Sequence, residues 1–284
     1  MPQLCDLHVH SHFSDGTCSP AELISLAEAR QLSAIALCDH NTIDGLPDFM
    51  AAAEGSTVRA VPGIEFSTDY QGTELHILGL FIQPRHYDRI NKLLAIYQQK
   101  KEESNLALAN ALRQAGYDID YEAVKAKTSG IPNRAHFSAV LIEKGYFSTR
   151  KECFQAILSP KNGLYTPPPR PNAFESISFI QEIGAVSVLA HPFLSLSEAE
   201  LRDFLKKAVP RGLDGMETIY STYDDAQTRL ARAIAAEFGI KESGGSDFHG
   251  SNKPDIAIGT GRGNLKIPLR FLHMLESKIE KAPT

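Results

Sequence analysis

Short apolar runs alternate with segments of helical character along most of this chain of 284 residues. Such an alternation is typical of a parallel β-sheet whose strands are joined by crossover helices. The first predicted helix, 20–31, starts with a capping box of Ser19 and Glu22 and has Pro20 at its first position. Strands are predicted at 4–10, 33–38, 58–66, 74–81, 185–190 and 215–220 and near residue 240. We therefore expect an α/β fold in which the sheet curls into a barrel.

A purely helical stretch interrupts this alternation. A long charged helical pattern covers 90–114, and three shorter helices are predicted before the run Pro167-Pro168-Pro169. No clear strand pattern occurs in this part of the sequence. We expect a helical insertion subdomain at 99–167, which would cap the substrate, between two barrel segments at 1–98 and 168–284.

Two imidazoles and a carboxylate stand close together at the end of the first predicted strand. His8 and His10 alternate along the strand, so their side chains point to the same face. Asp15 follows in the turn. A lone histidine at a strand end is more often structural, but three metal-binding side chains within eight residues favour a divalent-ion site.

More histidines and carboxylates fall at or beside the ends of the later strands. Chemistry in such barrels gathers at the carboxyl ends of the strands, so these side chains are expected to meet. Imidazole and carboxylate ligands without thiolate suit Mn²⁺, with Zn²⁺ or Fe²⁺ as alternatives, and nine ligands would serve two or three ions. Gly244 and Gly245 are expected to let the backbone approach the site closely. The nine candidate ligands are His8, His10, Asp15, His40, Glu65, His76, His191, Asp247 and His249.

Composition excludes several other functions. The formal net charge of −5 gives no global attraction to nucleic acid or to an anionic membrane, so a polyanion would be bound locally. The four cysteines show no CxxC spacing, and no apolar run approaches the length of a membrane span. We expect a cytoplasmic protein with no membrane or duplex-DNA partner.

The order of these motifs resembles that of the PHP (polymerase and histidinol phosphatase) family. The resemblance rests on a few short motifs over about 1–90 and 170–284: Asp6-Leu7-His8-Val9-His10, Ser14-Asp15-Gly16, Asp39-His40, Pro62-Gly63-Ile64-Glu65, His191-Pro192 and Ser246-Asp247-Phe248-His249. It implies a distorted (β/α)7 barrel, similar to a TIM barrel, that holds two or three metal ions and hydrolyses phosphoesters. The related amidohydrolases usually carry a lysine bridge where Glu65 stands here.

The same resemblance implies how the ligands would be shared. His8, His10, Glu65 and Asp247 would hold one ion, and Glu65, His76 and His191 a second. Asp15, His40 and His249 would hold a third. His12 departs from the family pattern, since relatives often carry threonine there, and its role is left open.

The length and the helical insertion look most like the small stand-alone bacterial members of the family. We therefore expect a metal-dependent phosphoric monoester hydrolase that removes the 3′-phosphate of 3′,5′-nucleoside bisphosphates and leaves a nucleoside 5′-monophosphate. The alternatives are a 5′→3′ exoribonuclease acting on short 5′-phosphorylated RNA and a histidinol-phosphate phosphatase. His12, Asp15 and Asp39 are candidates for proton transfer, and Asp6 and Asp39 for orienting an imidazole.

The substrate-binding residues are expected in and beside the insertion. Asn133 and Arg134 stand at a predicted helix start, where backbone N–H groups favour an anion, and Lys161 and Arg170 flank the loop returning to the barrel. These residues could clamp the phosphate that is not cleaved, or could simply be surface residues. The protein is expected to be a monomer or a small homo-oligomer.

Overall fold

The computed structural model describes residues 3–128 and 130–279. These residues form two compact units. Those up to Arg89 and from Pro171 onward make one, the barrel unit, and Ile90–Arg170 make the other, the helical unit. The sequence placed the helical subdomain at 99–167, inside the bounds of the helical unit, and the continuous helix α3 (Tyr87–Gln114) crosses the first of those bounds.

The barrel unit contains a single sheet in the order β7-β6-β5-β4-β3-β2-β1-β8. β1 to β3 run parallel, as do β5 to β7, whereas β4 is antiparallel to both β3 and β5. This reversed strand distorts the barrel. The strands are β1 (Leu4–Val9), β2 (Ala34–Leu37), β3 (Arg59–Tyr70), β4 (Thr73–Leu80), β5 (Val186–Leu189), β6 (Gly215–Tyr220), β7 (Lys241–Gly245) and β8 (Ile267–Pro268).

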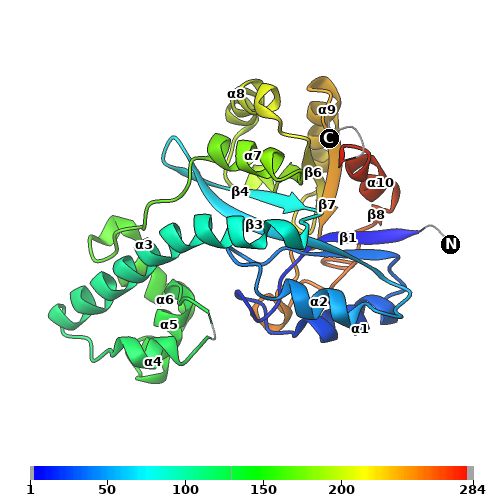
Figure 1. Cartoon of the computed structure of the whole chain (residues 1–284). Helices are drawn as coiled ribbons and strands as arrows, with labels where there is room; N and C mark the ends of the chain where they lie inside the picture. The colour runs from blue at the N-terminus through cyan, green and yellow to red at the C-terminus, as the bar shows by residue number, and fades with distance from the viewer. Residues whose placement is uncertain (1–2, 129, 280–284) are drawn as a thin grey trace. The chain divides into compact units, whose positions relative to one another are not determined.

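Helices surround these strands (Figure 1). Each helix buries one face; in α8, for example, Leu201, Phe204 and Leu205 are buried while the charged residues between them face solvent. The capping box predicted at Ser19 is present, and Ser197 and Asp224 begin two further helices in the same way. The helices are α1 (Pro20–Ala29), α2 (Leu46–Ala52), α7 (Ala173–Glu182), α8 (Glu198–Ala208), α9 (Asp225–Glu237) and α10 (Arg270–Glu276).

The two ends of the sheet approach each other at the carboxyl end of β1. The amide of His10 donates to the carbonyl of Phe248 at 2.9 Å, and the amide of Asp247 donates to the carbonyl of His8 at 2.9 Å. The buried carboxylate of Asp6 accepts the amides of Ser246 at 2.8 Å and of Gly259 at 2.7 Å. The expected α/β barrel is thus confirmed, and it is nearly closed.

Close packing at this seam depends on glycine. A β-carbon at Gly245 would lie 2.1 Å from Cβ of His8 and 2.9 Å from Oε1 of Glu217. No side chain can occupy that space without moving His8. The close backbone approach expected for Gly245 is therefore confirmed.

The helical unit has its own core. Leu112, Phe137 and Leu141 are fully or almost fully buried in it, and its described residues contain no strand. Its helices are α3, α4 (Tyr121–Lys125), α5 (Arg134–Glu143) and α6 (Arg150–Cys153).

Some features of the barrel unit escape sequence patterns. β3 continues to Tyr70, beyond the predicted end at residue 66, because it forms a long antiparallel hairpin with β4. The two-residue strand β8 and the seven-residue helix α10 are too short to give a periodic signal. Among the described residues, no helix is long and apolar enough to cross a membrane.

Candidate metal centre

The nine predicted ligands converge in the barrel unit. They form four overlapping groups in which one ligand atom from each residue lies within 4.8 Å of the others. His8, Glu65 and His76 lie on strands, and the remaining six follow the ends of strands. The overlapping groups are His8, His10 and Asp247; His8, Glu65 and His191; His40, Glu65 and His76; and His10, Asp15, His40 and His249.

Glu65 occupies the middle of the cluster and is fully buried. Its Oε1 lies 2.8 Å from Nδ1 of His76 and 3.1 Å from Nε2 of His191. Its Oε2 lies 3.2 Å from Nε2 of both His8 and His10. Oε2 also lies 3.0 Å from Nδ1 of His40. Oε1 thus faces two imidazoles and Oε2 faces three, so the two oxygens could ligate different ions.

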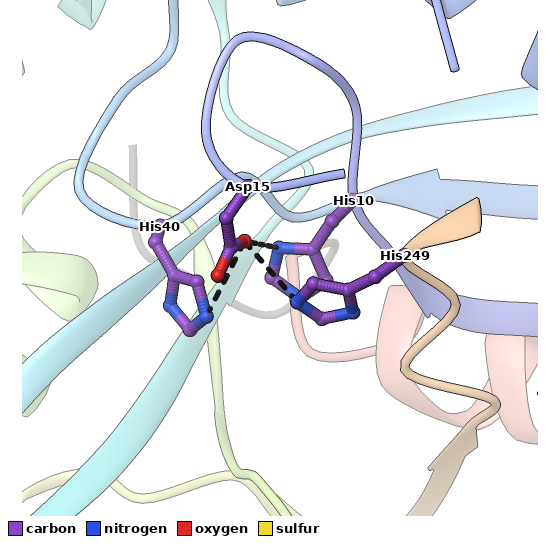
Figure 2. Close-up of side chains that lie close together, drawn as sticks. All are labelled: His10, Asp15, His40 and His249. Carbon is purple, nitrogen blue, oxygen red and sulfur yellow. Dashed lines mark ion pairs between the residues drawn. The ribbon is translucent and has the colours of Figure 1, made fainter. Parts of the chain in front are cut away.

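Asp15 is the centre of a third set (Figure 2). Its Oδ1 lies 3.2 Å from Nε2 of His249 and 3.9 Å from both Nε2 of His40 and Nδ1 of His10. His10 also presents Nε2 to Oδ1 of Asp247 at 3.3 Å, so its ring connects two sets. The structure therefore adds His10 to the third set that the sequence implied.

Several buried polar atoms in the cluster point to metal ligation. Nδ1 of His10, Nδ1 of His40 and Oε2 of Glu65 are buried and make no hydrogen bond with the described residues. Leaving a buried polar atom unsatisfied costs about 1–3 kcal/mol, so such atoms call for another partner. Imidazole nitrogens and carboxylate oxygens without thiolate are the donors that Mn²⁺, Zn²⁺ or Fe²⁺ accepts. The cluster therefore fits divalent metal ions.

The carboxylates and imidazoles of the cluster shift one another's pKa values. Burial alone would raise the pKa of Glu65, but His40, His8 and His76 hold it well below its usual value. Burial would lower the pKa of His10, yet the nearby carboxylates of Asp247 and Glu65 raise it to about 9. Glu65 similarly raises the pKa of His76 to about 10 against the effect of burial. Glu65 and Asp247 thus favour the protonated forms of His10 and His76, and divalent ions would supply that positive charge instead.

Two of the ligands adopt strained backbone conformations. His191 has φ +29° and Asp247 has φ +56°, in the region that favours glycine. Non-glycine residues stay in this region only where their surroundings impose it, and such positions concentrate at functional sites. The surrounding contacts therefore hold both backbones in conformations that place these two side chains in the cluster.

Glu217, on β6, is a functional residue that sequence reasoning missed. It is fully buried. Its Oε1 lies 3.0 Å from Nδ1 of His8, and its Oε2 accepts the amide of His191 at 2.7 Å. It therefore fixes which nitrogen of His8 faces Glu65 and also places the backbone of His191. A carboxylate within an apolar strand was the only signal in the sequence.

Replacing Glu217 by glutamine should weaken divalent-metal binding by about 10–100-fold, because a carboxamide no longer orients and polarises the His8 ring. A competition titration with a chromogenic chelator measures this change. Glu242→Gln on the neighbouring strand β7 is the matched control, since Glu242 binds Arg232 and Thr218 instead. Equal metal affinity in the two variants would contradict the role of Glu217.

The other carboxylates near the ligands have different partners from those expected. Asp6 binds backbone amides of the seam. Asp39 accepts from the amide and hydroxyl of Ser11 at 2.8 and 2.6 Å and from the hydroxyl of Ser14 at 2.6 Å. The hydrogen bonds of both thus hold backbone and loop, where an imidazole was the expected partner.

The candidates for proton transfer also differ from one another. His12 is exposed, with its ring stacked on Phe13, and belongs to none of the four groups. Burial would raise the pKa of Asp15, but His40 and His249 hold it far below its usual value. Asp15 is therefore ionised and suited to metal ligation, and a proton-donor role for it, His12 or Asp39 stays a prediction.

The predicted substrate residues all lie in the helical unit. Asn133 caps α5 by accepting the amide of Ala135 at 2.9 Å. Arg134 donates to the carbonyl of Leu158 at 3.1 Å, and its guanidinium carbon lies 4.7 Å from the ring centre of Tyr165. Lys161 is exposed and Arg170 is half-buried. Asn133 and Arg134 thus have structural roles within their unit, and phosphate binding by the four residues remains a prediction.

The barrel and its cluster define a class of protein: a metal-dependent hydrolase with a multinuclear centre. Residues 6–160 match the PHP domain, and this match spans more than half of the chain. The chain belongs to the PHP family and is a metal-dependent phosphoesterase.

Known relatives agree with this assignment. A 5′-3′ exoribonuclease of Haemophilus influenzae is 30% identical, over 88% of this chain and 91% of that protein. A 3′,5′-nucleoside bisphosphate phosphatase of Chromobacterium violaceum is 27% identical, over 89% and 90%. A structure from Bifidobacterium adolescentis, described as a metal-dependent phosphoesterase, superposes with a TM-score of 0.84 at 26% identity and covers 98% of both chains.

Proposed function

We propose that this protein hydrolyses the 3′-phosphate of 3′,5′-nucleoside bisphosphates and releases a nucleoside 5′-monophosphate and phosphate. The observation that carries the proposal is the Glu65 carboxylate, whose Oε1 faces two imidazoles and whose Oε2 faces three others, so that it could help to hold two ions beside one phosphoryl group. The Chromobacterium violaceum phosphatase, similar over most of both chains, supports this choice of substrate.

Divalent ions bound here, for which we propose Mn²⁺, would neutralise a phosphate and lower the pKa of a bound water to about 7. The protein's own residues hold the ligands in place. Glu217 and the strained backbones at His191 and Asp247 fix their directions, and Asp39 holds the loop that leads to Asp15. No protein nucleophile is required for this chemistry.

A second candidate is 5′→3′ cleavage of short 5′-phosphorylated RNA. The charge of the helical unit favours it: residues 90–170 contain twelve Lys and Arg against seven Asp and Glu, whereas the whole chain has 29 against 34. A basic unit attracts a phosphate chain. The Haemophilus influenzae relative also carries that activity in its name. The same excess of Lys and Arg over Asp and Glu disfavours histidinol phosphate, because that substrate bears a cationic amine.

A kinetic comparison with Mn²⁺-loaded protein tests both candidates. Adenosine 3′,5′-bisphosphate should yield 5′-AMP and phosphate, with a kcat/KM at least about tenfold above that for histidinol phosphate. Cleavage of a 5′-phosphorylated triribonucleotide, but not of its 5′-hydroxyl form, would support the second candidate. Release of 3′-AMP, or faster turnover of histidinol phosphate, would overturn the proposal, and turnover of the triribonucleotide alone would favour the exonuclease.

A further inference from the structure

Two residues that are not candidate metal ligands donate hydrogen bonds to Asp247. Its Oδ1 faces the imidazoles, at 3.3 Å from Nε2 of His10 and 3.4 Å from Nδ1 of His249. Its Oδ2 accepts the hydroxyl of Tyr220 at 2.7 Å and the ammonium of Lys253 at 2.6 Å. One carboxylate oxygen is thus directed toward the ligands and the other toward these two donors.

The two donors differ in their access to solvent. Tyr220 is 6% exposed and lies within the protein. The side chain of Lys253 is 39% exposed, although it contacts a carboxylate that is only 6% exposed. The Lys253 ammonium therefore reaches solvent beside the cluster, whereas the Tyr220 hydroxyl does not. An ammonium has three N–H donors, and Asp247 is the one partner that the described contacts give it.

The loop that carries Lys253 is fixed to the loop that carries Asp15. After His249, a short turn covers Gly250–Asn252. The amide of Ser251 donates to Oγ1 of Thr17 at 3.0 Å, and the side chain of Asn252 donates to the carbonyl of Asp15 at 2.8 Å. The turn before Lys253 is therefore held in place by the loop of Asp15, and the Lys253 ammonium lies beside Asp247 at the edge of the cluster.

We propose that Lys253 binds a non-bridging oxygen of the phosphoryl group at the metal centre, while Tyr220 keeps Asp247 in place. A phosphate dianion attracts an ammonium strongly, and a lysine acts toward phosphate as a mobile point charge. This role rests on the phosphoesterase function proposed above but does not depend on which nucleotide is the substrate.

The test measures binding of inorganic phosphate by calorimetry, with saturating Mn²⁺, and metal content after desalting. Lys253→Met should bind phosphate about 10–100-fold more weakly than the wild type, with unchanged metal content, because it loses one charged hydrogen bond. Lys253→Arg should recover most of the affinity. Tyr220→Phe should lose metal, with phosphate affinity unchanged once Mn²⁺ is saturating.

Lys266→Met is the matched control. Lys266 is exposed and precedes β8, which pairs with the first residues of β1, at the opposite end of that strand from the cluster. It should bind phosphate like the wild type. Wild-type phosphate affinity in Lys253→Met overturns the proposal, as does a loss of metal that accounts for its weaker binding. Wild-type protein that binds phosphate through Lys253 yet hydrolyses neither nucleotide would instead refute only the substrate proposed above.

Discussion

Glu65→Gln should reduce kcat/KM for any phosphoester substrate by about 10³-fold or more, which corresponds to about 4 kcal/mol of transition-state stabilisation. The carboxylate is fully buried and its two oxygens face different sets of imidazoles. Glutamine keeps the shape but replaces one oxygen with an NH₂ group, which cannot ligate a cation. The variant should therefore also bind fewer ions per chain, as elemental analysis would show.

Two controls separate this effect from misfolding. Glu54→Gln, an exposed change at the end of α2, should leave activity and metal content at wild-type values. Circular dichroism of Glu65→Gln should match that of the metal-free wild type. A folded Glu65→Gln protein with full metal content and near-normal turnover would rule out a bridging role for Glu65.

Removal of the metal should abolish activity, and Mn²⁺ should restore it. Binding should also depend on pH, because metal and protons compete for the same imidazole nitrogens. Without metal, the pKa values of His10 and His76 are about 9 and about 10, so both rings are protonated near neutral pH. Lowering the pH favours the proton, and raising it favours the metal. Affinity should thus increase by roughly tenfold per pH unit for each proton displaced.

Chelator competition at several pH values between about 6 and about 9 measures this slope. Calorimetry in buffers of different ionisation enthalpy counts the released protons independently. Turnover that survives exhaustive chelation would contradict a metal-dependent centre. A metal affinity that is constant across this pH range would contradict metal binding that displaces protons from His10 and His76.

The barrel was predictable because its signals are local. A strand of alternating residues followed by a capping box, as between Leu4 and Glu22, specifies both elements within a few residues. The convergence of the nine candidate ligands was also predictable, because the carboxyl ends of the strands meet at one edge of a barrel.

The surrounding residues depend on distant contacts and were not predictable in the same way. Glu217 and Lys253 acquire their roles only once β6 and the turn after β7 lie beside residues that are distant in sequence. Asp39 shows the converse: its place beside His40 suggested an imidazole partner, but the backbone turns its carboxylate toward Ser11 and Ser14. Sequence motifs therefore indicate the candidate ligands better than they indicate the residues that hold those ligands in place.

The seam between β1 and the segment after β7 has a consequence for biosynthesis. His8 and His10 leave the ribosome more than two hundred residues before Asp247 and His249, yet all four belong to the same cluster. The nascent chain cannot assemble the full centre until translation has passed residue 249. A bound divalent ion would link β1 to the segment after β7, so metal binding would also stabilise the closed form of the barrel.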